Sequence, residues 1–207
     1  MADGCSNRFG KRPSSQPDPN PIAVTDVELC VQNFLGKRTE KIMYPVSIGY
    51  AGAVQRINDL ISNGHNAEAL VTTAFTVEKT IRRTLRQLVV SAGFRSIDAE
   101  KIVKGLGGLE RLKGTWELYD PNHRKLPALI GADWATFDAT AKMRNKLVHG
   151  ERVYNLADCR TQAIDTLAAL NRLKAAFDAE YGYSGWDSLK VRRVGHLHKD
   201  PKINWTK

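Results

Sequence analysis

Residues 67–92 read AEALVTTAFTVEKTIRRTLRQLVVSA, and this stretch decides the fold class. Its apolar residues recur at steps of three and four, so they fall on one broad helical face: Leu70, Val71, Ala74, Phe75, Ile81, Leu85, Leu88 and Val89. Gly93 follows, and glycine is the commonest residue just past a helix end. The pattern predicts a helix of about seven turns.

Further helices are predicted on both sides of this stretch. Similar periodicity marks the segments Thr25–Gly36, 46–62, 96–106, 109–119, 133–149 and 155–181. Ser96 is expected to cap one of these helices, and Asn155, with Asp158 three residues on, is expected to cap the last. Residues 120–131 contain Pro121 and Pro127 and are predicted to form a loop.

No run of alternating Val, Ile and Thr lies between turn residues, so no strand is predicted. The sequence also has no repeat period and no sustained heptad pattern, which disfavours a solenoid or a long coiled coil. It therefore predicts an all-α protein, a compact up-and-down helical bundle of about five to seven helices.

The length of 207 residues fits one domain with tails. Residues 1–21 are rich in proline and polar side chains and are expected to be a disordered leader. Residues 22–183 are expected to form the helical domain, and residues 184–207 a basic C-terminal tail.

Cysteine usage and hydropathy indicate the compartment. Cys5, Cys30 and Cys159 are odd in number and widely scattered, which argues against a disulfide framework and a zinc site. His196 and His198 alternate but have no cluster of further ligands, which favours solvated tail residues over a metal site. No run approaches the ~18 apolar residues of a membrane span, and no signal peptide is recognised. We expect a cytoplasmic protein without metal, cofactor or membrane contact.

The net charge of +9 and a pI near 9.6 favour a polyanionic partner, because basic side chains gain affinity by displacing counterions from phosphates. Arg192 and Arg193 in the tail are candidate RNA-binding residues. The aromatic residues Tyr183, Trp186 and Trp205 lie among these basic residues; they either stack on bases of single-stranded RNA or pin the tail to its own domain.

Residues 144–150 read RNKLVHG and end the predicted helix 133–149. Trp134, Phe137, Ala141 and Val148 form an apolar stripe on this helix, and Arg144 falls inside the stripe. Asn145 and His149 are four residues apart and share the bordering face. Gly150 suits the left-handed position that closes a helix.

An arginine inside an apolar stripe requires a partner or an anion, since an unpaired buried charge is costly. Glu78 is the matching acid, because it lies in the middle of the apolar face of residues 67–92. Two interpretations stay open. Arg144 forms an ion pair with Glu78 while His149 caps carbonyl groups at its own helix end, or Arg144 and His149 act on a phosphate. They are compatible, since Glu78 could hold Arg144 in position.

The string Arg-Asn-Lys-Leu-Val-His-Gly, at the end of an amphipathic helix and followed by one more long helix, resembles the HEPN superfamily, whose signature is Arg, four to six residues, then His. The resemblance covers about residues 46–181. It implies a metal-independent endoribonuclease that acts as a homodimer, often as a toxin or antiviral defence effector. Some relatives of that superfamily have lost catalysis and bind RNA or a partner protein, which is the alternative function.

Residue roles follow from this resemblance and from the chemistry of the side chains. Arg144 would grip the scissile phosphate, His149 would transfer protons, and Asn145 would assist, with Glu78 in support and Lys146 as a further RNA-binding residue. Attack by the ribose 2′-hydroxyl would leave a 2′,3′-cyclic phosphate. An antitoxin or another regulatory protein is an expected partner.

Overall fold

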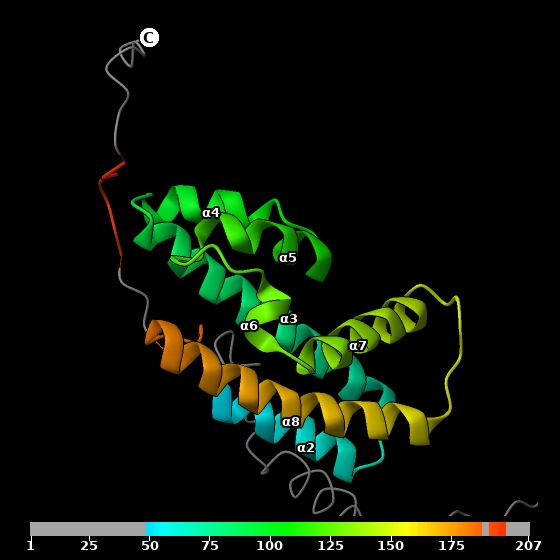
Figure 1. The fold of residues 1–207 in the computed structure, drawn as a ribbon. Coiled ribbons are helices and arrows are strands. Elements are labelled where there is room, and N and C mark those ends of the chain that lie inside the picture. The colour runs from blue at the N-terminus through cyan, green and yellow to red at the C-terminus, as the bar shows by residue number, and fades with distance from the viewer. Residues whose placement is uncertain (1–48, 188–190, 198–207) are drawn as a thin grey trace, which may run out of the picture. The chain divides into compact units, whose positions relative to one another are not determined.

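The computed structural model describes residues 49–187 and 191–197, which all belong to one unit of the chain, Ser47–Lys207. This part of the chain forms seven helices and no strand, which confirms the all-α prediction. The helices are α2 (Tyr50–Ser62), α3 (Asn66–Ser91), α4 (Ser96–Lys104), α5 (Gly108–Tyr119), α6 (Leu126–Ile130), α7 (Asp133–Val148) and α8 (Leu156–Tyr181) (Figure 1). The predicted leader 1–21 and the predicted helix Thr25–Gly36 lie outside the described residues.

Helix α3 is the central element, since it packs against α2, α4, α5, α7 and α8 (Figure 1). It buries threonines as well as the predicted apolar residues. The hydroxyl groups of Thr73, Thr80 and Thr84 each donate to the carbonyl oxygen four residues earlier, so they are satisfied within the helix. Phe75 departs from the predicted apolar face, because its side chain is 52% exposed.

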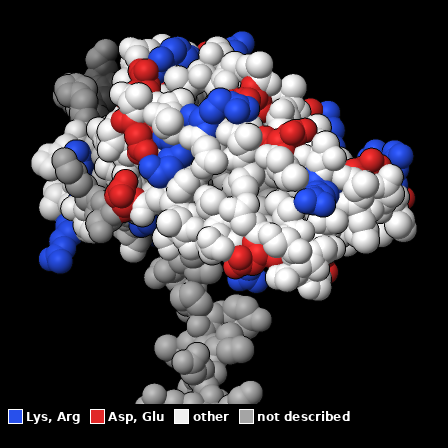
Figure 2. Space-filling view, turned by 90° about the horizontal axis from the view of Figure 1, so that it is seen from below, with Lys and Arg blue, Asp and Glu red and all other residues white. Residues whose placement is uncertain are grey.

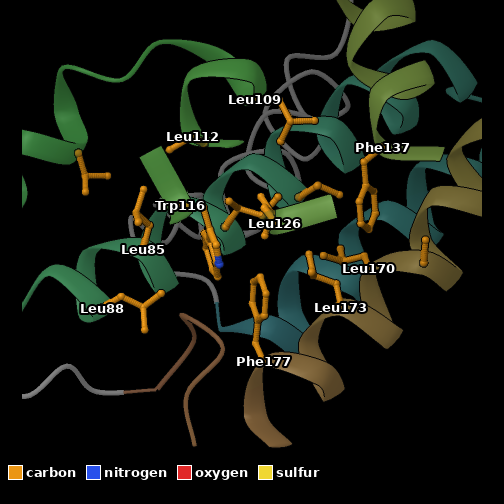
Figure 3. Packing of buried hydrophobic residues seen from close by; sticks show 14 of the residues in the cluster. Leu85, Leu88, Leu109, Leu112, Trp116, Leu126, Phe137, Leu170, Leu173 and Phe177 are labelled. Atoms are coloured by element: carbon orange, nitrogen blue, oxygen red, sulfur yellow. The ribbon is translucent and has the colours of Figure 1, made fainter. Parts of the chain in front are cut away.

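The main core lies between α3, α5, α7 and α8 (Figure 3). The rings of Trp116 and Phe177 stack with centroids 5.1 Å apart, and Phe137 of α7 is buried in the same cluster. A second, smaller cluster joins α3 to α8 through four buried residues: Ala69, Leu70, Cys159 and Ala163. Met143 and Leu147 of α7 pack against this second cluster. Helix α7 therefore contacts both clusters.

Two local predictions are wrong. The predicted loop 120–131 contains the short helix α6, because Pro127 occupies the first helical turn, where its missing N–H would have no partner anyway, and Leu126 is fully buried. Ser96 does not cap α4: Arg95 is the N-cap residue, and the Ser96 hydroxyl instead accepts a hydrogen bond from the backbone N–H of Arg192.

The end of α8 and the residues after it pack on α3. Asn155 caps the start of α8 as predicted, accepting from the N–H of Asp158 at 2.8 Å. Tyr183 is buried, and the Trp186 Nε1–H donates to the Thr80 hydroxyl at 3.0 Å. For these two aromatic residues the structure therefore agrees with pinning to the domain, whereas Trp205 lies outside the described residues. None of the described helices is long and apolar enough to span a membrane.

Candidate functional site

The end of helix α7 is closed by Gly150 in a left-handed conformation, as the sequence predicts. Gly150 has a φ of 68°, and its N–H donates to the carbonyl of Leu147 at 3.2 Å. The N–H of Glu151 donates to the carbonyl of Lys146 at 2.9 Å, which completes a Schellman motif. These backbone groups cap the helix, and the exposed His149 ring has no hydrogen-bond partner among the described residues. His149 is the C-cap residue by position, but the interpretation in which its side chain binds the carbonyl groups at the helix end is not supported.

Helix α7 is fixed against α8 by a buried polar network. The hydroxyls of Thr140 and Thr166 lie 2.6 Å apart, and the Gln162 side-chain amide donates to the Thr140 hydroxyl at 2.7 Å. Because both threonines are fully buried, these bonds specify how α7 lies on α8.

The predicted apolar stripe of α7 holds for Phe137, which is buried, and for Trp134 and Ala141, which pack partly buried against the main core. It is wrong for Val148, which is 55% exposed. The last turn of α7 instead turns Leu147 toward the second cluster, so its buried side is not the side that the stripe predicts.

Arg144 is held by three groups. Its Nη2 lies 3.1 Å from Glu78 Oε2, and its Nη1 donates to Asn145 Oδ1 at 2.9 Å. Its guanidinium carbon lies over the ring of Phe75, 4.5 Å from the ring centroid. The Arg144 side chain is 19% exposed, and its Nε is buried without a partner. The pairing with Glu78 that the sequence suggested is thus present, and donor capacity remains.

Glu78 is itself anchored. Its Oε1 lies 2.7 Å from Arg82, whose guanidinium also donates to the carbonyl oxygens of Val103 and Leu106 at 2.7 Å. One carboxylate therefore serves two arginines, which leaves this cluster with a surplus positive charge. A fixed, partly desolvated cation of this kind favours an anionic ligand.

Two cavities lie beside α7, and Arg144 lines the smaller one. A small one of about 50 Å³ lies between α3, α5 and α7 and is lined by Glu78, Gly108, Arg144 and Asn145, among others. A larger one of about 530 Å³ shares Gly108 and Asn145. Its two lysines, Lys113 and Lys142, are each paired with an acid that lines the same cavity, Glu110 and Asp138. The amino end of α5 borders both cavities, and its N-cap residue, Gly107, has no side chain to cap the helix. Free N–H groups at a helix amino end favour anions.

The structure brings some predicted site residues together and leaves others apart. Glu78, Arg144 and Asn145 meet at the small cavity, whereas His149 lines neither cavity. Arg192 and Arg193 line a separate groove of about 450 Å³ with Arg86 and Arg95, beside α4, and Lys146 is exposed on the last turn of α7.

Sequence reasoning missed the contributions of Phe75, Gly108, Lys113 and Lys142. The neighbouring glycines Gly105 and Gly107 indicate a turn between two helices, which the structure has between α4 and α5, but they do not indicate a cavity. On the face shown in Figure 2, acidic and basic side chains are interspersed rather than gathered into a patch of one sign. Charge on that face therefore does not mark a binding surface.

No group of His, Cys, Asp and Glu within the described ranges could hold a metal ion. Comparison with protein-family models, curated proteins and solved structures gave no match. The resemblance to the HEPN superfamily therefore rests on the motif and on its place at the end of α7.

Proposed function

We propose that this protein is a metal-independent endoribonuclease of the HEPN type that acts as a homodimer. The observation that carries the proposal is the arrangement of Arg144, which Glu78, Asn145 and Phe75 hold beside a small cavity. Five residues further along the chain lies His149, which is exposed and whose ring has no hydrogen-bond partner within the described ranges.

Arg144 is the phosphate-binding residue in this proposal. Its planar guanidinium fork can donate two parallel hydrogen bonds to phosphate oxygens. Glu78 and Asn145 fix its position before the substrate arrives, which avoids reorganisation during the reaction. The amino end of α5, across the same cavity, adds a favourable field for the negative charge that builds up on the phosphorane.

His149 transfers protons. An imidazole side chain can both accept and donate a proton, and the His149 ring has no competing hydrogen-bond partner within the described part of the chain. In a twofold dimer, His149 of one protomer accepts the proton of the ribose 2′-hydroxyl while its counterpart donates a proton to the leaving 5′-oxygen. The 2′-oxygen bonds to phosphorus as the P–O5′ bond breaks, so the products carry a 2′,3′-cyclic phosphate and a 5′-hydroxyl.

A catalytically inactive module that binds RNA or a partner protein is the second candidate function. It is favoured by one observation: His149 lines neither the cavity of Arg144 nor the larger cavity beside it. Purified protein incubated with single-stranded RNA or transfer RNA in EDTA separates the two. Cleavage supports the nuclease, whereas a gel shift without cleavage supports the binding module. A toxin or defence role, a cytoplasmic location and an antitoxin partner belong to the nuclease proposal.

A further inference from the structure

Phe75 is an unusual residue for its position in α3. Its sequence neighbours Ala74 and Thr76 are 8% and 6% exposed, whereas the Phe75 ring is 52% exposed in the middle of the most buried helix. A single exposed apolar side chain needs no functional explanation by itself. What distinguishes Phe75 is the group that its ring contacts.

One face of the Phe75 ring is occupied by the candidate phosphate-binding residue. The guanidinium carbon of Arg144 lies over the ring at 4.5 Å from the centroid, within the range of a cation–π contact. Glu78, one turn further along α3, binds the same guanidinium. The ring and the cation thus form a fixed pair whose exposed part is aromatic.

A phosphate bound at Arg144 would carry a nucleoside on each side, so a neighbouring base would lie within reach of this ring. Proteins that bind single-stranded RNA stack its unpaired bases on aromatic rings and on arginine planes. We infer that Phe75 is a stacking platform for a base next to the phosphate held by Arg144, and that the substrate is single-stranded at that position. This inference rests on the proposed function and adds a substrate class to it.

A paired base would have to leave its own stack before it could use the ring, and that costs free energy. Single-stranded RNA is therefore bound more tightly than the same sequence in a duplex. The affinity gained by stacking should depend little on which base is bound, because every base has a π-face.

The test measures RNA affinity in a cleavage-deficient His149→Ala background, so that the RNA stays intact. Phe75→Leu keeps an apolar side chain but removes the π-face, and Phe75→Trp restores one. Leu118→Ala removes an apolar side chain that is 70% exposed on α5 and serves as the matched control. Fluorescence anisotropy with a labelled single-stranded RNA gives the Kd, and light scattering gives the oligomeric state.

Phe75→Leu is expected to raise the Kd about 5- to 150-fold, the range that corresponds to loss of one stacked base. Phe75→Trp should bind like the parent, with tryptophan fluorescence quenched by RNA, and Leu118→Ala should not change the Kd. Unchanged affinity of Phe75→Leu, in a protein whose wild type cleaves RNA, overturns the stacking platform and leaves the nuclease standing. Loss of affinity in parallel with a changed oligomeric state also overturns it, because the ring is then a protein contact. A wild type that neither cleaves nor binds RNA removes the proposed function itself.

Discussion

Glu78 of α3 binds Arg144 of α7, with Glu78 Oε2 3.1 Å from Arg144 Nη2. The two residues are 66 positions apart in the sequence, so this ion pair joins the central helix to the helix that carries the motif. Because the same carboxylate also binds Arg82, Glu78 connects the carboxyl end of α7 to the carbonyl groups of Val103 and Leu106 at the carboxyl end of α4. Among the groups that hold Arg144, Glu78 is thus the one that links it to Arg82.

Glu78→Ala should lower both stability and activity. The variant leaves two partly buried guanidinium groups without their carboxylate, so we expect a loss of about 1–3 kcal/mol in the free energy of unfolding. Urea unfolding followed by circular dichroism measures it, and a double-mutant cycle with Arg144→Ala isolates the pair. Asp138→Ala breaks an ion pair on α7 with the exposed Lys142 and is the control. It should lower the free energy of unfolding by less than about 0.5 kcal/mol. Additive effects of Glu78→Ala and Arg144→Ala would contradict the coupling.

Thr140→Val should loosen α7 from α8. Valine keeps the volume but removes the hydroxyl that Gln162 and Thr166 use, so the variant should be destabilised by about 1–2 kcal/mol. Thr161→Val, at an exposed position of α8, is the control and is expected to change stability by less than about 0.5 kcal/mol. Equal stabilities of the two variants would show that the buried network does not fix α7.

Asp120 should make stability depend on pH in the acid range. Burial alone would raise its pKa, but hydrogen bonds from Arg124 and Tyr181 outweigh burial and hold the pKa at about 2. Since this value lies below the unfolded value of about 3.9, the stabilisation is complete above about pH 4 and is lost as the pH falls toward 2. The stability difference between wild type and Asp120→Asn should therefore shrink over that window. A difference that stays constant from pH 5 to pH 2 would contradict the assignment.

Gly107→Asp should have opposite effects on stability and on RNA binding. Gly107 is the N-cap of α5 with a φ of −83°, which any residue adopts, and nothing lies within 4 Å of an added Cβ. An aspartate there caps α5 and should stabilise the protein by a few tenths to about 1 kcal/mol. The same negative charge competes with a phosphate at the amino end of α5, so the Kd for RNA should rise. Gly107→Ser, a neutral cap, is the control; a weakened affinity in both variants would indicate a steric effect instead.

The helices with long, strong periodicity could be predicted from the sequence alone. Helices α3, α7 and α8 begin and end within a few residues of the expected positions, and the Gly150 closure and the Asn155 cap follow from local chemistry. The pairing of Glu78 with Arg144 was also predictable, because each is a charged residue inside an apolar face. Two opposite charges in one core are expected to pair, since each is costly to bury alone.

The remaining features depend on tertiary packing, which periodicity does not encode. Val148 and Phe75 match their apolar patterns but are about half exposed. The end of α7 packs through Leu147 rather than Val148, and the Phe75 ring lies against the Arg144 guanidinium. The cavity beside Gly108 arises where the amino end of α5 meets α7, and no local signal fixes that meeting.

The most direct test of the proposed nuclease is RNA cleavage in EDTA by the wild type and by His149→Ala, with His65→Ala as a control that removes another exposed histidine. Circular dichroism and light scattering establish that all three proteins have the same helix content and oligomeric state. The account predicts that the wild type and His65→Ala leave products with 2′,3′-cyclic phosphate ends, detected by mass spectrometry, and that His149→Ala leaves the RNA intact. Equal cleavage by His149→Ala and the wild type would contradict it.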